Sequence, residues 1–215
     1  MRRRRVAVAL APLLVLLTAC GATPLARVAG GPAALHGTEI GDVIARPALA
    51  LTDTGGAPFD LAARAPGELT AVFFGYTRCP DLCPTTMADL AAARRSLGAA
   101  DRDRVRVVFV TEDPVTDTPP VLRAWLDRFD PSFVGLVGGD GRTGQVLDAL
   151  KAPRTSVLPT HDAPGAPPHT HTDGQGATVE HAGSVYAFRG GRVVVYTGGT
   201  TAPEYAEDFR ALLRS

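Results

Sequence analysis

The 215-residue sequence has no surplus of charge of either sign, since 22 basic and 22 acidic side chains balance at neutral pH. A nucleic-acid-binding domain needs a basic surplus to displace counterions from phosphates, so the composition excludes that function class. Glycine and proline, with 23 and 18 residues, also fall short of the share typical of low-complexity disorder. With 45% hydrophobic residues, the chain is long enough for one globular domain with its own core.

No apolar run is long enough to cross a bilayer as a helix. The run Val6–Leu17 has twelve residues, whereas a spanning helix needs about 20. It follows four arginines and precedes Leu17-Thr18-Ala19-Cys20, which resembles a bacterial lipobox. We therefore predict a lipoprotein signal peptide at residues 1–19, lipid attachment at Cys20 and a flexible tether at residues 20–37. The alternative is an ordinary signal peptide with an incidental cysteine. The anchored form would place the domain on the extracytoplasmic face of the cell membrane.

Residues 38–215 are predicted to form one α/β domain. Two short strands, at residues 47–51 and 59–61, flank a turn and form an N-terminal β-hairpin. Apolar β-branched runs then alternate with helical periodicity. The predicted strands are 69–74, 105–111, 133–137, 184–188 and 192–196, and the predicted helices are 84–98, 118–130, 144–150 and 203–213. This order predicts a thioredoxin-like fold, in which helices flank a central mixed sheet.

Residues 152–179 interrupt that pattern, because they hold five prolines, three histidines and almost no large apolar side chain. We predict a long loop insertion here. His169 and His171 are candidate accessory metal ligands that would collect metal or guide it inward. The alternative is a solvated insertion that happens to contain histidines.

The chain has three cysteines, and two remain once Cys20 carries lipid. Cys79 and Cys83 stand where a predicted buried strand ends and a helix begins, a place where ligands bind in α/β sheets. The helix dipole and unpaired amides there favour thiolates. A structural disulfide is the alternative for an extracytoplasmic pair, but closing so small a loop contributes little. Both cysteines are therefore candidate metal ligands and candidate redox residues.

Spacing favours metal binding over disulfide exchange only modestly. Side chains four residues apart on a helix have Cβ atoms about 5–6 Å apart, and a disulfide needs about 3.5–4.5 Å. Two thiolates that share a metal can lie farther apart, although a loose first helical turn still allows a disulfide. A soft metal needs a third ligand, and His181 stands just before a predicted strand that would face the cysteine loop. A lone histidine is more often a polar surface residue. Thioredoxin-like oxidoreductases carry a cis-proline at this point, and no proline occurs between Pro168 and Pro203.

Residues 38–213 resemble the Sco/SenC family of copper-binding proteins, which help to assemble cytochrome c oxidase in bacteria and mitochondria. Residues 75–84, GYTRCPDLCP, are similar to the family's copper motif, with Arg78 where histidine is frequent. Residues 113–119, DPVTDTP, resemble a second family segment, and Glu180-His181 resembles the family's Asp-His pair. The resemblance implies a thioredoxin-like domain that is tethered to a membrane.

The resemblance also implies a metallochaperone rather than an enzyme. Its copper ligands carry over to Cys79, Cys83 and His181, a set that suits Cu(I) and tolerates Cu(II). The implied acceptor is the dinuclear copper site of cytochrome c oxidase subunit II. A thioredoxin-like reductant or another copper chaperone would be a further partner. The alternative is a thiol–disulfide oxidoreductase that reduces the oxidase's copper-site cysteines or other extracytoplasmic thiols. Weaker alternatives are a copper buffer or sensor, a zinc site and a peroxidase.

Several carboxylates receive weaker predictions. Asp81 and Glu180 would place charge near the metal or orient His181, and plain solvated carboxylates are the alternative. Asp113 and Asp117 are predicted to cap the following helix or to order its loop.

Overall fold

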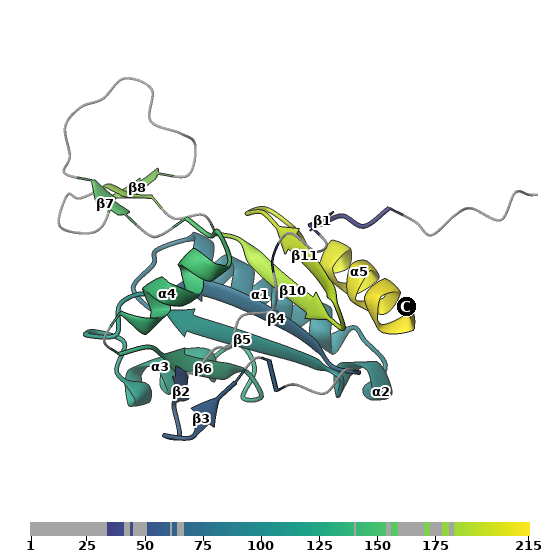
Figure 1. Cartoon of the computed structure of the whole chain (residues 1–215), viewed down its shortest axis with the longest axis horizontal. Coiled ribbons are helices and arrows are strands. Elements are labelled where there is room, and N and C mark those ends of the chain that lie inside the picture. Colours follow the sequence, from purple (N-terminus) through teal and green to yellow (C-terminus); the bar gives the residue numbers. More distant parts are fainter. Residues whose placement is uncertain are drawn as a thin grey trace, which may run out of the picture. The chain divides into compact units, whose positions relative to one another are not determined.

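The computed structural model describes residues 34–40, 44, 51–60, 62–63, 67–139, 141–153, 156–158, 170–172, 178–180 and 183–215. Within these ranges the chain forms an eight-stranded mixed sheet with helices packed on it (Figure 1). The predicted signal peptide and Cys20 lie outside the described residues. No helix in the described ranges has the length and apolarity needed to cross a membrane.

The main sheet has the strand order β1-β11-β10-β4-β5-β6-β2-β3. Strands β4, β5 and β6 pair in parallel, and every other pair of neighbours is antiparallel. The strands are β1 (Thr38–Glu39), β2 (Leu51–Asp53), β3 (Pro58–Phe59), β4 (Leu69–Gly75), β5 (Val105–Thr111), β6 (Val134–Val137), β10 (Val185–Arg189) and β11 (Arg192–Tyr196). The helices are α1 (Leu82–Arg95), α2 (Ala99–Arg102), α3 (Pro119–Leu126), α4 (Arg142–Ala149) and α5 (Ala202–Arg214).

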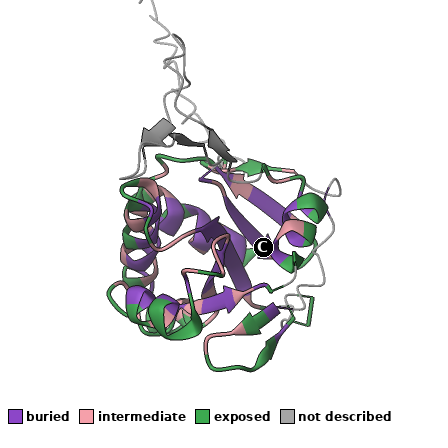
Figure 2. Cartoon of the chain, turned by 90° about the vertical axis from the view of Figure 1, so that its left-hand side faces the viewer, coloured by how far each residue is buried: buried purple, intermediate pink, exposed green. Residues whose placement is uncertain are grey.

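Strand β4 is buried along its whole length, which is why it reads as a continuous apolar run rather than an alternating one. Alternate side chains of β4 enter two separate cores. Phe73 packs in the cluster that contains apolar residues of α1, α3 and α5. Phe74 packs in the cluster that contains Val146 and Leu147 of α4. Figure 2 shows the buried strands between helices whose outer faces are exposed. Trp125 of α3 is buried in the first cluster, as expected.

The predicted central strands and longer helices are confirmed, with bounds that shift by a few residues. The predicted N-terminal hairpin is present as β2 and β3, which pair Leu51 with Phe59. The short elements β1 and α2 were not predicted, because two to four residues carry no readable periodicity. Strand β1 pairs with β11, and the backbone N–H groups of His36 and Gly37 donate to the Asp208 carboxylate of α5. Residues 36 and 37, at the end of the predicted tether, are therefore hydrogen-bonded to α5.

The prediction of a long loop at residues 152–179 was wrong in part. Three short strands, β7 (Ser156–Leu158), β8 (Thr170–Thr172) and β9 (Thr178–Glu180), form a separate antiparallel sheet of order β7-β9-β8. Threonine and valine supply most of these strand residues, and β-branched side chains favour extended backbone. The prolines that pointed to a loop lie before and between the strands.

Candidate metal centre

Cys79 and Cys83 lie where β4 ends and α1 begins, at the carboxyl edge of the parallel strands. Neither thiol is part of a disulfide, and both are buried, with exposed fractions of 5% for Cys79 and 0% for Cys83. The backbone N–H of Cys83 donates to Cys79 Sγ over 3.3 Å, and the Cys79 N–H donates to the Tyr76 carbonyl over 3.2 Å. The turn thus holds two thiols close together at one edge of the sheet, as the sequence predicted, and their role as metal ligands stays a prediction.

Gly75, the last residue of β4, provides the space for the Cys83 sulfur. A Cβ atom at this position would lie 2.7 Å from Cys83 Sγ, closer than van der Waals radii allow. A side chain here would displace the sulfur or the strand. The glycine in the cysteine motif is therefore a steric requirement of the second thiol.

The pKa of the Cys83 thiol is raised well above its ordinary value. Burial is the main cause, and the adjacent Cys79 and the charge of Glu112 act in the same direction. Sequence reasoning expected the start of α1 to favour a thiolate, and for Cys83 that expectation was wrong, because desolvation of a buried sulfur outweighs the local dipole. A bound cation would reverse this balance by pairing with the thiolate.

Leu82, between the two cysteines, contacts two glycines from distant parts of the chain. A Cβ atom at Gly183, just before β10, would overlap Leu82 Cδ2, and one at Gly198, after β11, would lie 3.3 Å from Leu82 Cδ1. Gly183 also has a φ of +54°, which a residue with a side chain rarely adopts. The segment that enters β10 therefore meets the cysteine loop, as the predicted topology required.

His181 precedes Gly183 by two residues and, like His169, lies outside the described residues. Glu180 and His171 are placed as strand residues of β9 and β8. In the part of the chain that the structure describes, no three His, Cys, Asp or Glu side chains gather as a metal cluster. The structure thus brings the two thiols together, and the third ligand stays a prediction.

The buried Asp117 carboxylate hydrogen-bonds to the cysteine loop and does not cap a helix. Its carboxylate, fully buried, accepts hydrogen bonds from the backbone N–H of Thr77 at 2.9 Å and from the hydroxyls of Thr77 and Thr111. Thr118 takes the N-cap position of α3, with no capping bond from its side chain. Helix capping by Asp117 was wrong, and the loop that it orders is the cysteine loop. The loop before α3 is ordered by Asp113, whose Oδ1 accepts the Thr116 N–H at 3.2 Å. Residues 113–119 thereby attach to the loop that carries Cys79.

Arg78 and Asp113 make a second connection between these two segments. The guanidinium Nη2 of Arg78 donates to Asp113 Oδ2 over 3.0 Å. Burial acts to raise the pKa of Asp113, but hydrogen bonds from Thr116 and Arg78 outweigh it and lower that pKa. The carboxylate therefore stays charged and holds the loop ahead of Cys79.

Asp81 takes the N-cap position of α1 and is exposed. Its carbonyl accepts the Thr85 N–H at 3.1 Å, which starts the helix. Its side chain lies 3.5 Å from the Thr85 hydroxyl, and the predicted action of its charge on a metal stays a prediction.

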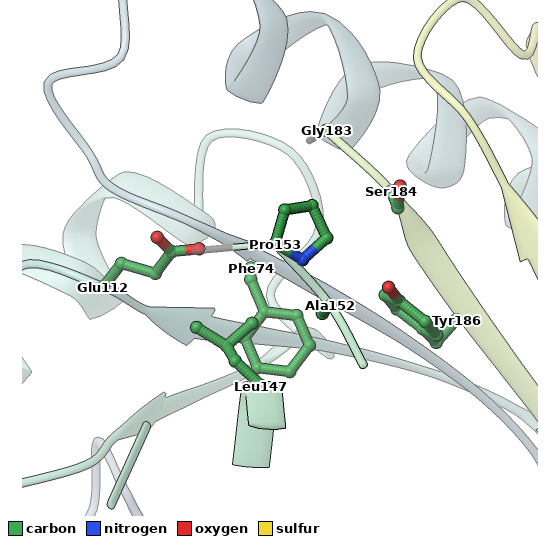
Figure 3. Close-up of a pocket in the computed structure, with 8 residues that line it drawn as sticks. All are labelled: Phe74, Glu112, Leu147, Ala152, Pro153, Gly183, Ser184 and Tyr186. Carbon is green, nitrogen blue, oxygen red and sulfur yellow. The ribbon is translucent and has the colours of Figure 1, made fainter. Parts of the chain in front are cut away.

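Glu112 lies at this edge of the sheet and was not singled out by the sequence analysis. It directly follows β5, and its N–H donates to the Gly75 carbonyl over 2.8 Å. It lines a small pocket of about 10 Å³ with Phe74, Leu147, Ala152, Pro153, Gly183, Ser184 and Tyr186. Figure 3 shows the Glu112 side chain on one side of this pocket and Gly183, Ser184 and Tyr186 on the other. Its place directly after a strand that ends at the ligand-binding edge was a usable signal.

The comparisons with known proteins agree with this geometry. A model of the SCO1/SenC family matches residues 42–214. The chain belongs to the SCO1/SenC family. A Stutzerimonas stutzeri protein named for copper binding is 32% identical over 139 residues, which are 65% of this chain and 61% of that protein. An SCO2-like protein of Rickettsia felis is 39% identical over 85 residues, 40% of this chain and 41% of that protein. The matches thus span less than two thirds of these relatives.

Solved structures of this family share the fold. Bradyrhizobium japonicum ScoI with copper bound matches with a TM-score of 0.57 and 28% identity, over 82% of this chain and 98% of that one. The BsSco structure, described as containing a disulfide switch in a Sco protein of cytochrome c oxidase assembly, matches with a TM-score of 0.57 and 19% identity, over 81% and 95%. The expected thioredoxin-like fold, a mixed sheet flanked by helices, is confirmed.

Proposed function

We propose that this SCO1/SenC protein is a copper metallochaperone that binds one copper ion through the Cys79 and Cys83 thiolates and the His181 imidazole. The observation that carries the proposal is the pair of buried, adjacent sulfurs at the edge of the sheet, which form no disulfide. Two thiolates and one imidazole select a soft or borderline ion over Mg²⁺ or Ca²⁺. The copper-bound ScoI structure and the relative named for copper binding support copper as the ion.

The acceptor we propose is the dinuclear copper site of cytochrome c oxidase subunit II. The description of BsSco as a cytochrome c oxidase assembly protein supports oxidase assembly as the process that this chain serves. Three ligands leave an open position at which an acceptor's thiolate can attack the metal, so the product is a transferred ion rather than a converted substrate. Lipid on Cys20 would hold the domain at the extracytoplasmic face of the membrane, near such an acceptor. A thioredoxin-like reductant or another copper chaperone would keep the thiols reduced or supply the metal.

Copper binding must remove protons, because the ligands are two thiolates and a neutral imidazole. Because the pKa of Cys83 is raised, the proton of this thiol is hard to remove when no metal is bound. We therefore expect apparent copper affinity to fall as the pH is lowered, and to vanish when the two thiols are oxidised to a disulfide.

A copper titration of the reduced protein beside its His181→Ala variant tests the proposal. We expect one tight equivalent with a visible thiolate charge-transfer band for Cu(II), and loss of both in the variant. Equal copper binding by the variant would remove His181 from the site, and His169→Ala and His171→Ala variants would then show whether the insertion histidines bind instead. No tight copper in the wild type would contradict the proposed function.

Thiol–disulfide exchange is the second candidate function. It is favoured by the hydrogen bond from the Cys83 N–H to Cys79 Sγ, which stabilises a Cys79 thiolate, and by the disulfide switch described for BsSco. The same pair could serve both roles. His181→Ala separates them, because it should leave disulfide exchange with a model thiol largely intact while copper binding is lost.

A further inference from the structure

Leu82 is the first residue of α1 and stands between the two cysteines in the chain. Its side chain is partly buried and packs against the core cluster that contains Cys79 and Cys83. Because a leucine has no atom that binds a metal or carries a charge, its role must come from what its side chain contacts.

The two methyl groups of Leu82 face glycines of two other chain segments. A Cβ atom at Gly183 would overlap Leu82 Cδ2 and would lie 3.1 Å from Cγ, and a Cβ atom at Gly198 would lie 3.3 Å from Cδ1. Gly183 precedes β10 (Figure 3) and Gly198 follows β11, and these strands pair Val185 with Tyr196 at the same end. The leucine side chain thus fills the space that the two glycines leave at the open end of the β10–β11 hairpin.

Gly183 connects this contact to the proposed third ligand. It follows His181 by two residues, and two residues of extended chain span at most about 7 Å. Leu82 is joined to Cys83 by one peptide bond. The packing of Leu82 on Gly183 therefore limits how far the backbone at His181 can lie from the backbone of the second thiol.

Strand pairing holds the same segment only farther along the chain. The described pairs between β10 and β4 begin with Val185 and Phe73, four residues after His181. The contact between Gly183 and Leu82 lies two residues nearer to His181 than this first pair. It therefore holds the segment ahead of the point where the sheet begins to hold it.

We infer that Leu82 is a positioning residue, which holds the segment before β10 at the distance from which the His181 imidazole reaches copper on the two thiols. This inference rests on the proposed function, in which His181 is the third ligand. Groups that orient metal ligands without binding the metal change metal affinity about 10- to 100-fold when they are substituted. Leu82 would act in this way through packing rather than through a hydrogen bond.

The test is a double-mutant cycle on the reduced full-length protein, with Leu82→Ala, His181→Ala and the double variant. Cu(I) affinity is measured without oxygen, by competition with a chelator of known affinity. Leu82→Ala should weaken Cu(I) binding about tenfold when His181 is present. In the His181→Ala background it should weaken binding by at most about twofold, because a positioning residue acts only through the ligand that it positions. Leu82→Met, which keeps the side-chain volume, should retain most of the affinity.

Leu213→Ala is the matched control. Leu213 belongs to the same core cluster, and its carbonyl accepts a hydrogen bond from Arg104, which directly precedes β5. This is the end of the parallel strands away from the thiols. Leu213→Ala should lower the midpoint of urea denaturation and keep Cu(I) affinity within about twofold. Urea denaturation also shows whether Leu82→Ala folds, and Leu82→Val, a smaller truncation, replaces it in the cycle if it does not.

Equal weakening by Leu82→Ala in both backgrounds would overturn the inference, because Leu82 would then act on the thiols or on the fold rather than on His181. Wild-type Cu(I) affinity in Leu82→Ala would overturn it as well. A wild type without tight Cu(I), or equal affinity of the wild type and His181→Ala, would instead contradict the proposed function, so the two failures are distinguishable.

Discussion

The two sides of the candidate site are held by different means. The cysteine side, residues 75–83, is fastened to the core by the buried carboxylate of Asp117, the Arg78–Asp113 ion pair and the packing of Cys83 on Gly75. The proposed third ligand, His181, belongs to the insertion between α4 and β10. The described part of this insertion, β7, β8 and β9, pairs within itself and not with the main sheet.

This difference predicts that stability and metal binding respond to substitutions in different parts of the chain. The two thiols are embedded in the core, and the free energy of unfolding depends on the groups that arrange them. The insertion contains His181, the proposed third ligand, and its described strands do not pair with the main sheet. Substitutions on the cysteine side should therefore affect stability and copper together, and substitutions at His181 should affect copper alone.

Asp117→Ala should produce the largest loss of stability on the cysteine side. It leaves the Thr77 N–H and two hydroxyls without their acceptor, and we expect about 3 kcal/mol lower free energy of unfolding. Urea denaturation of the apo protein measures this change. The control is Asp127→Ala, which removes an exposed carboxylate bonded to Arg123 and should cost at most about 0.5 kcal/mol. Equal effects of the two variants would mean that the buried network does not hold the loop.

Gly75→Ala should produce the next largest loss of stability. The added methyl group would meet Cys83 Sγ, and overpacking of this kind costs about 1–3 kcal/mol. Copper affinity should fall as well, because the sulfur is displaced. Gly67→Ala is the matched control, since a Cβ there meets nothing within 4 Å. A Gly75→Ala protein with wild-type stability and copper affinity would show that the loop adjusts freely.

Arg78→Ala should have a smaller effect that depends on pH. The pair is partly exposed, so we expect about 0.2–1 kcal/mol near neutral pH. Because the pKa of Asp113 is lowered in the folded state, its contribution to stability is present above the unfolded pKa of about 3.9 and is lost as the pH falls through the folded value. Denaturation at pH 6 and pH 3 measures how much the free energy of unfolding falls between the two pH values, and this fall should be smaller in the variant than in the wild type. If the fall is the same in both proteins, the lowered pKa of Asp113 is due to Thr116 rather than to Arg78.

His181→Ala should leave the stability of the apo protein unchanged, within about 0.5 kcal/mol. The same urea experiment measures it, beside the copper titration that the proposed function requires. A clear loss of apo stability would mean that His181 packs into the fold, and the contrast between the two sides of the site would then disappear.

Much of the fold follows from local patterns. Strands such as β4 and β5 appear as short apolar, β-branched runs, and α3 begins at Pro119-Pro120, a start signal visible in the sequence. The three short strands of the insertion were not predicted. The prolines near them indicated a loop, although the threonine and valine residues between these prolines form paired strands.

The amino-acid sequence was sufficient to predict the central strands, the longer helices and the pairing of two thiols at one loop, because periodicity and spacing are local properties. Three further features became visible only in the folded chain: Asp117 holds the loop from 40 residues away, Gly75 makes room for Cys83, and the Glu112 N–H donates to the Gly75 carbonyl. These contacts join residues distant in the chain, which no local pattern encodes. Parallel pairing of β4 with β5 brings them together at one edge of the sheet.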